Sequence, residues 1–232
     1  LHEIEAQDLR QSYYQFDVAE LRWDKGSGRF PFRIISQKNE GFRAACIILA
    51  IGADDCFYIP PELASFKRRF PEYILHSCEF DLHRATREHS LSKIVIVGGG
   101  LTAATLAKNL TNLGVHVVLI ARKPLKTQQF DFEPSWLGPQ ALQEFRDEPD
   151  WKKRREIIQQ VRGEGSVTPE IAEALMKSAT DGNLCLQTGA QILQIDRDRQ
   201  LRITTTKSTI NDVGLVILAT GYRFDLHRYQ FL

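Results

Sequence analysis

The sequence predicts an α/β fold in which a domain built on a parallel sheet is inserted into a second α/β domain, of which only part is present. Two observations lead to this prediction. A strand, a glycine-rich turn, a helix and a second strand follow one another over residues 93–121. In addition, the phrase IILAIGA at 47–53 is nearly repeated as VILATGY at 216–222, and each is an apolar run that stops at a glycine.

The βαβ pattern begins with KIVIV at 93–97, a β-branched apolar run typical of a buried parallel strand. The next residues, GGGLTA, place Gly98, Gly100 and Ala103 in the pattern G-x-G-x-x-G/A. We expect Gly98 to allow a tight turn, Gly100 to let the backbone approach a pyrophosphate, and Ala103 to let the helix pack on the strand. A helical run and the strand VHVVLIA at 115–121 complete the unit. The order predicts a Rossmann-like domain whose turn and first helical residues bind a dinucleotide, namely Gly98, Gly99, Gly100, Leu101, Thr102 and Ala103.

The end of the second strand indicates which dinucleotide to expect. An NAD site usually has Asp or Glu at this place, and here the residue is Ala121. Arg122 and Lys123 come next, with Lys126 nearby, and such cations attract a 2′-phosphate. The sequence therefore predicts NADP(H), with the alternative that these are ordinary basic surface residues after a strand.

The repeated phrases predict where two domains join. A β-rich stretch precedes each of them, with strands expected at 17–23 and 32–37 before the first and at 184–187, 190–196 and 201–206 before the second. We expect each phrase to form an apolar strand that stops at its glycine. Such a strand of a doubly wound sheet ends at the carboxyl edge, where cofactors bind. We therefore expect Gly52, Thr220 and Gly221 to be cofactor-binding residues near the hinge between the domains.

This arrangement resembles flavoproteins with two dinucleotide-binding domains, in which an NADPH domain interrupts an FAD domain. The phrases LAIG and LATG resemble the paired ATG-type linkers of that family, with Ile51 in place of the usual Thr. The resemblance implies four segments: 1–53 as the β-rich part of an FAD-type domain, 54–91 as a linker, 92–218 as the NADP(H)-binding domain with a helical insert at 130–182, and 219–232 as the return to the FAD-type domain.

A second stretch narrows the resemblance to flavin-dependent, class B, NADPH-using monooxygenases. FPEYILHSCEFD at 70–81 resembles their fingerprint F-x-G-x-x-x-H-x-x-x-[aromatic], which precedes the NADPH glycine loop. Phe70, His76 and Phe80 match, with Ser77 beside the histidine, while Glu72 replaces the family's glycine. The resemblance extends over residues 42–126 and 213–223.

The resemblance implies an enzyme that passes hydride from NADPH to FAD and then transfers oxygen to a small nucleophilic substrate. The protein's part in such chemistry is mainly to position cofactors, and no catalytic residue is predicted. FAD is expected only if a glycine motif precedes Leu1, because residues 1–46 contain none. Two alternatives stay open: an NADPH-dependent flavin reductase that passes electrons to another acceptor, and a non-catalytic NADP(H)-binding module.

The composition of the chain limits the kinds of partner that can be expected. A net charge of +1, from 30 Lys+Arg against 29 Asp+Glu, argues against a nucleic-acid partner, and no apolar run is long enough for a membrane span. Four scattered cysteines suit a reducing, cytoplasmic setting without a redox-active disulfide, and no metal-ligand spacing occurs among His83, His89 and His116. In the insert we expect helices at 151–162 and after Thr168, as a cover for the nicotinamide, a substrate wall or a homodimer contact.

Overall fold

The computed structural model describes residues 14–26, 28–52, 56–82, 93–163 and 165–223. The chain divides into two units by its contacts. The first unit consists of Leu1–Cys56 and Arg223–Leu232, and the second unit is Phe57–Tyr222. Within the first unit the backbone N–H of Arg223 donates to the carbonyl of Cys56 (2.7 Å). The domain boundaries expected from the sequence differ from this division and stay predictions.

The first unit contains a three-stranded antiparallel sheet, β1 (Val18–Trp23), β2 (Phe32–Ser36) and β3 (Gly41–Ala44). The first two strands lie where the sequence predicts them. The third was not predicted, because the turn before it depends on Asn39 at a φ of 63° and not on a glycine. Ser36 stabilises this turn, since its Oγ accepts from the backbone N–H groups of Lys38 and Glu40 (3.1 and 3.2 Å).

The prediction of a strand in the first repeated phrase is wrong. Residues 46–52 form no strand, and Ile48 and Leu49 are 88% and 42% exposed. An apolar run becomes a strand only where neighbours supply hydrogen bonds and cover, and no described strand pairs with this one. The second phrase has such neighbours, and its residues 216–218 belong to β11 (Leu215–Leu218).

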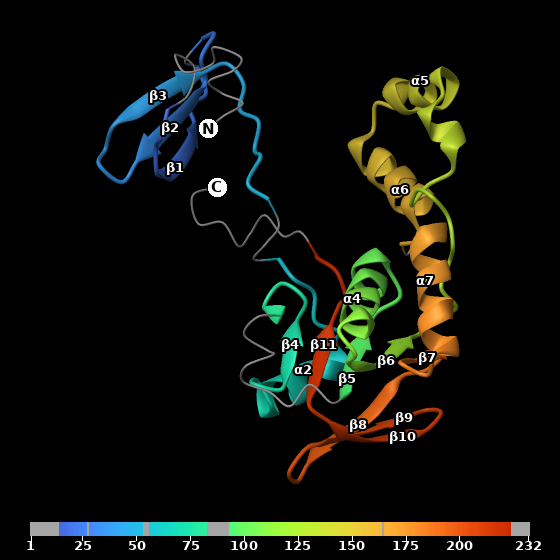
Figure 1. The fold of residues 1–232 in the computed structure, drawn as a ribbon. Coiled ribbons are helices and arrows are strands. Elements are labelled where there is room, and N and C mark those ends of the chain that lie inside the picture. Colours follow the sequence, from blue (N-terminus) through green and yellow to red (C-terminus); the bar gives the residue numbers. More distant parts are fainter. Residues whose placement is uncertain (1–13, 27, 53–55, 83–92, 164, 224–232) are drawn as a thin grey trace. The chain divides into compact units, whose positions relative to one another are not determined.

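The second unit is built on a five-stranded sheet in the order β4-β11-β5-β6-β7 (Figure 1). All four pairings are parallel. The strands are β4 (Ile74–His76), β5 (Lys93–Val97), β6 (His116–Ala121), β7 (Leu184–Thr188) and β11. The chain passes from β5 to β6 on one side of β5, and it later returns as β11 on the other side of β5. The carboxyl end of β5 is therefore the switch point of the sheet, where ligands bind in open α/β folds.

Both faces of this sheet are covered, as parallel sheets require. Ile94 and Ile96 of β5 point to a core shared with α4 (Leu101–Asn112) and α7 (Pro169–Thr180). Val95 points to the opposite core, which contains Leu63 of α2 (Pro61–Arg69) and residues of a second antiparallel sheet. That sheet consists of β8 (Ile192–Arg197), β9 (Leu201–Thr205) and β10 (Thr209–Val213).

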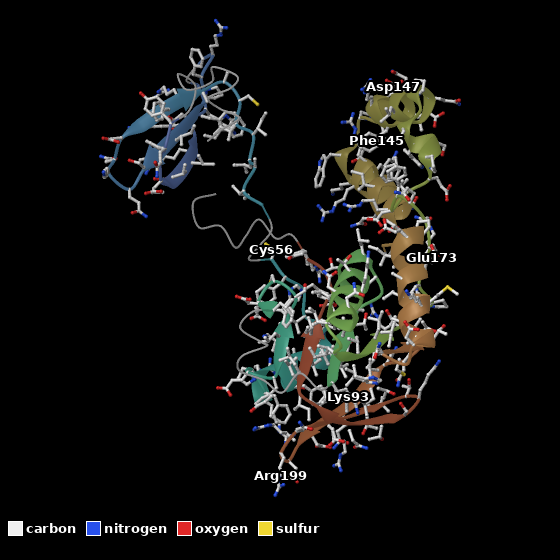
Figure 2. All side chains as sticks on the ribbon, in the orientation of Figure 1. Cys56, Lys93, Phe145, Asp147, Glu173 and Arg199 are labelled. Carbon is white, nitrogen blue, oxygen red and sulfur yellow. The ribbon has the colours of Figure 1, made fainter. Side chains whose placement is uncertain are left out.

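Several segments differ from the expectations. The stretch 54–91, expected as a linker, contains α2 and the edge strand β4; its residues 54–55 and 83–91 lie outside the described part. The strand expected at 184–187 is β7, a member of the parallel sheet, so the meander before β11 consists of β8, β9 and β10. In Figure 2 Lys93 stands at the start of β5, where its Nζ donates to the carbonyl of Asn211 in β10 of this meander (2.8 Å).

The insert at 130–182 divides into two parts. Helix α7 packs on the parallel sheet, because Leu175 is buried in the core with α4 and Ile171 packs against that core. Its N-cap is Thr168, as predicted, although the side chain makes no capping hydrogen bond. The turn η2 (Pro134–Leu137) and the helices α5 (Pro139–Asp147) and α6 (Trp151–Arg162) contain no buried residue.

No helix in the described ranges combines the length and the apolar character that crossing a membrane requires.

Gly98 joins the ends of three parallel strands. Its N–H donates to the carbonyl of Ile120 at the end of β6 (2.9 Å), and Ala219, directly after β11, donates to the carbonyl of Val97 (2.8 Å). A Cβ on Gly98 would lie 2.3 Å from the carbonyl oxygen of Ala219. Its φ of 152° is also one that L side chains rarely adopt. Only glycine fits this position.

We therefore expect Gly98→Ala to destabilise the protein by about 1–3 kcal/mol, because the added methyl group forces the ends of β5 and β11 apart. Gly100→Ala is the matched control, since a Cβ there would meet no atom within 4 Å. It should cost less than about 1 kcal/mol. Urea unfolding followed by circular dichroism measures both, and equal losses would contradict this account of Gly98.

Candidate functional site

A cavity of about 260 Å³ lies at the carboxyl edge of the parallel sheet. The glycine turn after β5 forms one wall, and the end of β11 with Thr220 and Gly221 forms another. The start of α2 and the connection between β7 and β8 close it, through Tyr58, Glu62 and Gln191. The cavity therefore coincides with the switch point that the strand order defines.

Helix α4 points its N-terminus at this cavity. Gly100 is the N-cap, no side chain caps the helix, and its first turn contains no acidic residue. The N–H groups of the first turn have no partner within the helix, and the helix dipole adds a partial positive charge there. Because Gly100 has open space where a Cβ would stand, an anion can approach the backbone directly. The arrangement suits a pyrophosphate.

A second cavity, of about 750 Å³, shares Gly99, Arg122 and Gln191 with the first. Lys123 and Lys126 also line it, so the side chains that follow β6 give it a positive charge. An anion that reaches from the glycine turn past the end of β6 would meet these three cations. The geometry suits a dinucleotide with a further phosphate on its ribose.

The histidine of the fingerprint lies outside the two cavities, at the end of the edge strand β4. His76 is fully buried, and its Nε2 lies 3.2 Å from the carbonyl oxygen of Gly221. The backbone N–H of Cys78 donates to Nδ1 (3.4 Å), which places the ring proton on Nε2 for donation to Gly221. Phe57 stacks on the imidazole and Tyr222 meets it edge-on, with centroids 5.1 and 5.7 Å away. His76 thus holds the backbone just after Thr220.

Burial governs the ionisation of this histidine. It lowers the pKa of His76, and the acceptor carbonyl of Gly221 offsets only part of the effect. Burial alone would raise the pKa of Glu79, but hydrogen bonds from Lys67 Nζ (2.7 Å) and from the backbone N–H of His76 (2.6 Å) outweigh it and lower that pKa. A neutral imidazole and an ionised carboxylate therefore fix the end of β4.

The other fingerprint positions make packing and backbone contacts. Phe70 and Phe80 are partly buried and pack against the two opposite cores of the sheet. The backbone N–H of Ser77 donates to the carbonyl of Leu218 at the end of β11 (2.9 Å). The fingerprint thus fastens β4 to β11, and none of its residues lines the two cavities.

The structure brings most of the predicted cofactor-binding residues together. Those that line the first cavity are Gly98, Gly99, Gly100, Leu101, Thr102, Arg122, Thr220 and Gly221. Ala103 is buried beneath the turn, at 1% exposure, and has a packing position. Gly52 belongs to the first unit and lines neither cavity. The binding roles of all these residues stay predictions.

Several lining residues were missed by sequence reasoning, among them Tyr58, Gly165 and Gln191. One signal was available for Tyr58, because Pro60 and Pro61 follow it and proline marks the start of a helix. The backbone N–H of Tyr58 donates to the carbonyl of Gly221 (2.9 Å), and the Thr220 hydroxyl donates to the carbonyl of Tyr58. Gln191 and Gly165 carry no comparable signal in the sequence.

A sequence model of the L-lysine 6-monooxygenase/L-ornithine 5-monooxygenase family matches residues 5–224. Comparison with curated protein sequences gives no significant match. The predicted resemblance to flavin-dependent, NADPH-using monooxygenases is confirmed by the match to this family.

Three solved structures share the fold. The reduced form of ornithine hydroxylase from Pseudomonas aeruginosa superimposes with a TM-score of 0.66 at 17% identity, over 98% of this chain and 58% of that one. L-lysine 6-monooxygenase from Pseudomonas syringae gives 0.63 at 16%, over 90% and 53%. Ornithine N-hydroxylase from Kutzneria sp. 744, in a structure with reduced FAD, NADP+ and L-ornithine, gives 0.62 at 18%, over 88% and 53%. The chain thus spans between half and two thirds of these relatives, and the predicted fold class is confirmed.

The buried His76 predicts how stability depends on pH. Its folded pKa is lowered, so between that value and the usual one near 6.5 the unfolded chain binds more protons, and stability is lost as pH falls through this window. We expect the free energy of unfolding to decrease when the pH is lowered from about 7.5 to about 5.5. His76→Gln should flatten this slope, at a cost of about 1–3 kcal/mol at high pH.

Urea unfolding at several pH values measures the slope. Glu79 does not interfere, because its stabilising contribution is lost only as pH falls below its usual value of 4.5. An unchanged slope in His76→Gln would assign the pH dependence to other groups.

Proposed function

The chain belongs to the L-lysine 6-monooxygenase/L-ornithine 5-monooxygenase family, and we propose that it serves NADPH-dependent oxygen transfer to the side-chain amine of a small amino acid such as ornithine or lysine. The terminal amine of such a substrate is a small nucleophile, which is the substrate class expected from the sequence. FAD enters the proposal through the family and would supply the redox and oxygen chemistry when bound. The homodimer considered for the insert stays a prediction.

One observation above all supports the NADPH part of this proposal. The uncapped N-terminus of α4 and the cations after β6 line two cavities that share Gly99 and Arg122. One dinucleotide can therefore place its pyrophosphate on the helix and its 2′-phosphate among the cations. No acidic residue occupies the end of β6, so no carboxylate there repels the 2′-phosphate.

The residues of this chain would bind and orient the cofactor. Gly100 would leave the backbone open to the pyrophosphate, and Arg122 would offer a planar guanidinium to the 2′-phosphate. Thr220 and Gly221 form the wall opposite the glycine turn. His76 fixes the carbonyl of Gly221 from behind and so keeps this wall in place.

The reaction itself is tested with FAD, NADPH and either L-ornithine or L-lysine added to the protein. Oxygen uptake coupled to formation of a hydroxylamine, detected by iodine oxidation, is the expected result. NADPH oxidation that needs an added electron acceptor and gives no hydroxylamine would contradict the proposal in favour of a flavin reductase. Binding of NADPH by a protein that shows no absorbance near 450 nm after incubation with FAD and removal of the unbound FAD would contradict it in favour of a non-catalytic nucleotide-binding module.

We expect Arg122→Ala to weaken NADPH binding by about ten- to a hundredfold, because a charge-assisted hydrogen bond is worth about 1.5–3 kcal/mol. NADH lacks the 2′-phosphate, so its affinity should change little. Isothermal titration of both nucleotides gives the two dissociation constants.

Arg155→Ala is the matched control, since Arg155 is an exposed arginine on α6 that lines neither cavity. It should leave both affinities as they are. Equal affinity of the unmutated protein for NADH and NADPH would contradict the assignment of the second cavity.

A further inference from the structure

The cationic cavity has a wall that comes from the insert. Gly165 lines it together with Lys123 and Lys126. A Cβ on Gly165 would stand 3.8 Å from the Cα of Gly100, so its backbone passes the glycine turn at close to van der Waals distance. The φ of 87° at Gly165 is one that favours glycine. A segment of the insert thus reaches the place where the pyrophosphate is expected.

This segment, residues 165–167, is joined to the chain just after the cations. The N–H of Val167 donates to the carbonyl of Lys126 (2.9 Å), and the N–H of Gln128 donates to the carbonyl of Val167 (3.0 Å). The Val167 side chain is fully buried in the core with α4. Lys126 and Gly165 are therefore parts of one connected backbone structure, and a shift of the segment moves both.

A side-chain pair closes this structure. Oδ1 of Asp131 accepts from the backbone N–H of Ser166 (3.0 Å) and from its hydroxyl (2.8 Å). Ser166 is only 4% exposed, and Arg162 lies 3.8 Å from the other carboxylate oxygen. Without an acceptor on residue 131, Ser166 would keep two buried donors unsatisfied, and the segment would have to move to reach water.

We propose that Asp131 and Ser166 are a positioning pair that sets the preference for a 2′-phosphate. They hold residues 165–167 in place, and through the bond from Val167 to the carbonyl of Lys126 they keep Lys126 in the cationic cavity, where it would meet the 2′-phosphate. Neither residue lines the cationic cavity itself; both line a neighbouring one of about 340 Å³. The inference deepens the proposed function and rests on its NADPH site.

The sign of the effect separates this role from simple electrostatics. Asp131 carries a negative charge, so its loss would by itself favour an anionic ligand nearby. Positioning requires the opposite result, which is weaker binding of the ligand with the additional phosphate.

The experiment is isothermal titration of NADPH and NADH into the unmutated chain and into Asp131→Ala, Ser166→Ala and Asp131→Asn. The first two variants should raise the dissociation constant of NADPH about tenfold and that of NADH less than about twofold. Asp131→Asn keeps an Oδ1 that accepts from Ser166 and should retain most of the preference. Asp147→Ala, an exposed carboxylate on α5 (Figure 2) that accepts from the Gln143 side chain, is the control and should change neither constant.

Each other outcome decides a separate point. A preference for NADPH that survives in Asp131→Ala and Ser166→Ala overturns the positioning pair and leaves the proposed function standing. If both nucleotides bind equally more weakly, the positioning pair is overturned in favour of a merely structural role. If Asp131→Asn binds NADPH as weakly as Asp131→Ala, the pair is overturned in favour of an effect of the carboxylate charge. If the unmutated protein binds NADPH and NADH equally well, the assignment of the NADPH site itself is overturned. If thermal melting shows Asp131→Ala to be unfolded, Ser166→Ala decides.

Discussion

The contact between Gly98 and the carbonyl of Ala219 is the constraint on which the rest of the second unit depends. At this point the central strand β5 ends, α4 begins, and β11 returns beside it after more than a hundred residues. Because no side chain fits between them, the three elements meet at backbone distance. The N-terminus of α4 and the glycine after β11 then face one cavity. Fold and binding site follow from the same close approach.

Much of this unit is predictable because its signals are local. The strand at 93–97, the turn and the helix are coded by consecutive residues, and the structure has the strand with the same bounds. The cations after β6 are also local, since they follow a strand end that the pattern already defines. Helix α7 was placed correctly for the same reason, because Thr168 and Pro169 mark its start.

The parts that could not be predicted depend on residues far apart in the sequence. Gly165 lies about forty residues from the cations beside it, and the backbone bonds of Val167 together with the Asp131–Ser166 bonds bring it there. Likewise, Tyr58 meets Gly221 across most of the chain. The fingerprint at 70–81 shows the converse case. Its pattern was found, but its residues fasten β4 to β11 and leave the cavities to others, and a pattern alone does not distinguish these roles.

The two repeated phrases show why even a strong local signal is not sufficient. VILATGY and IILAIGA have almost the same apolar content, yet only the first contains a strand among the described residues. β11 lies between β4 and β5, which satisfy its backbone on both sides, and the two cores cover its faces. Residues 46–52 have the composition of a strand without a described partner, and Ile48 and Leu49 are exposed accordingly. Strand formation is therefore a property of the sheet that receives a segment, and sequence predicts it only where the neighbouring strands can be predicted as well.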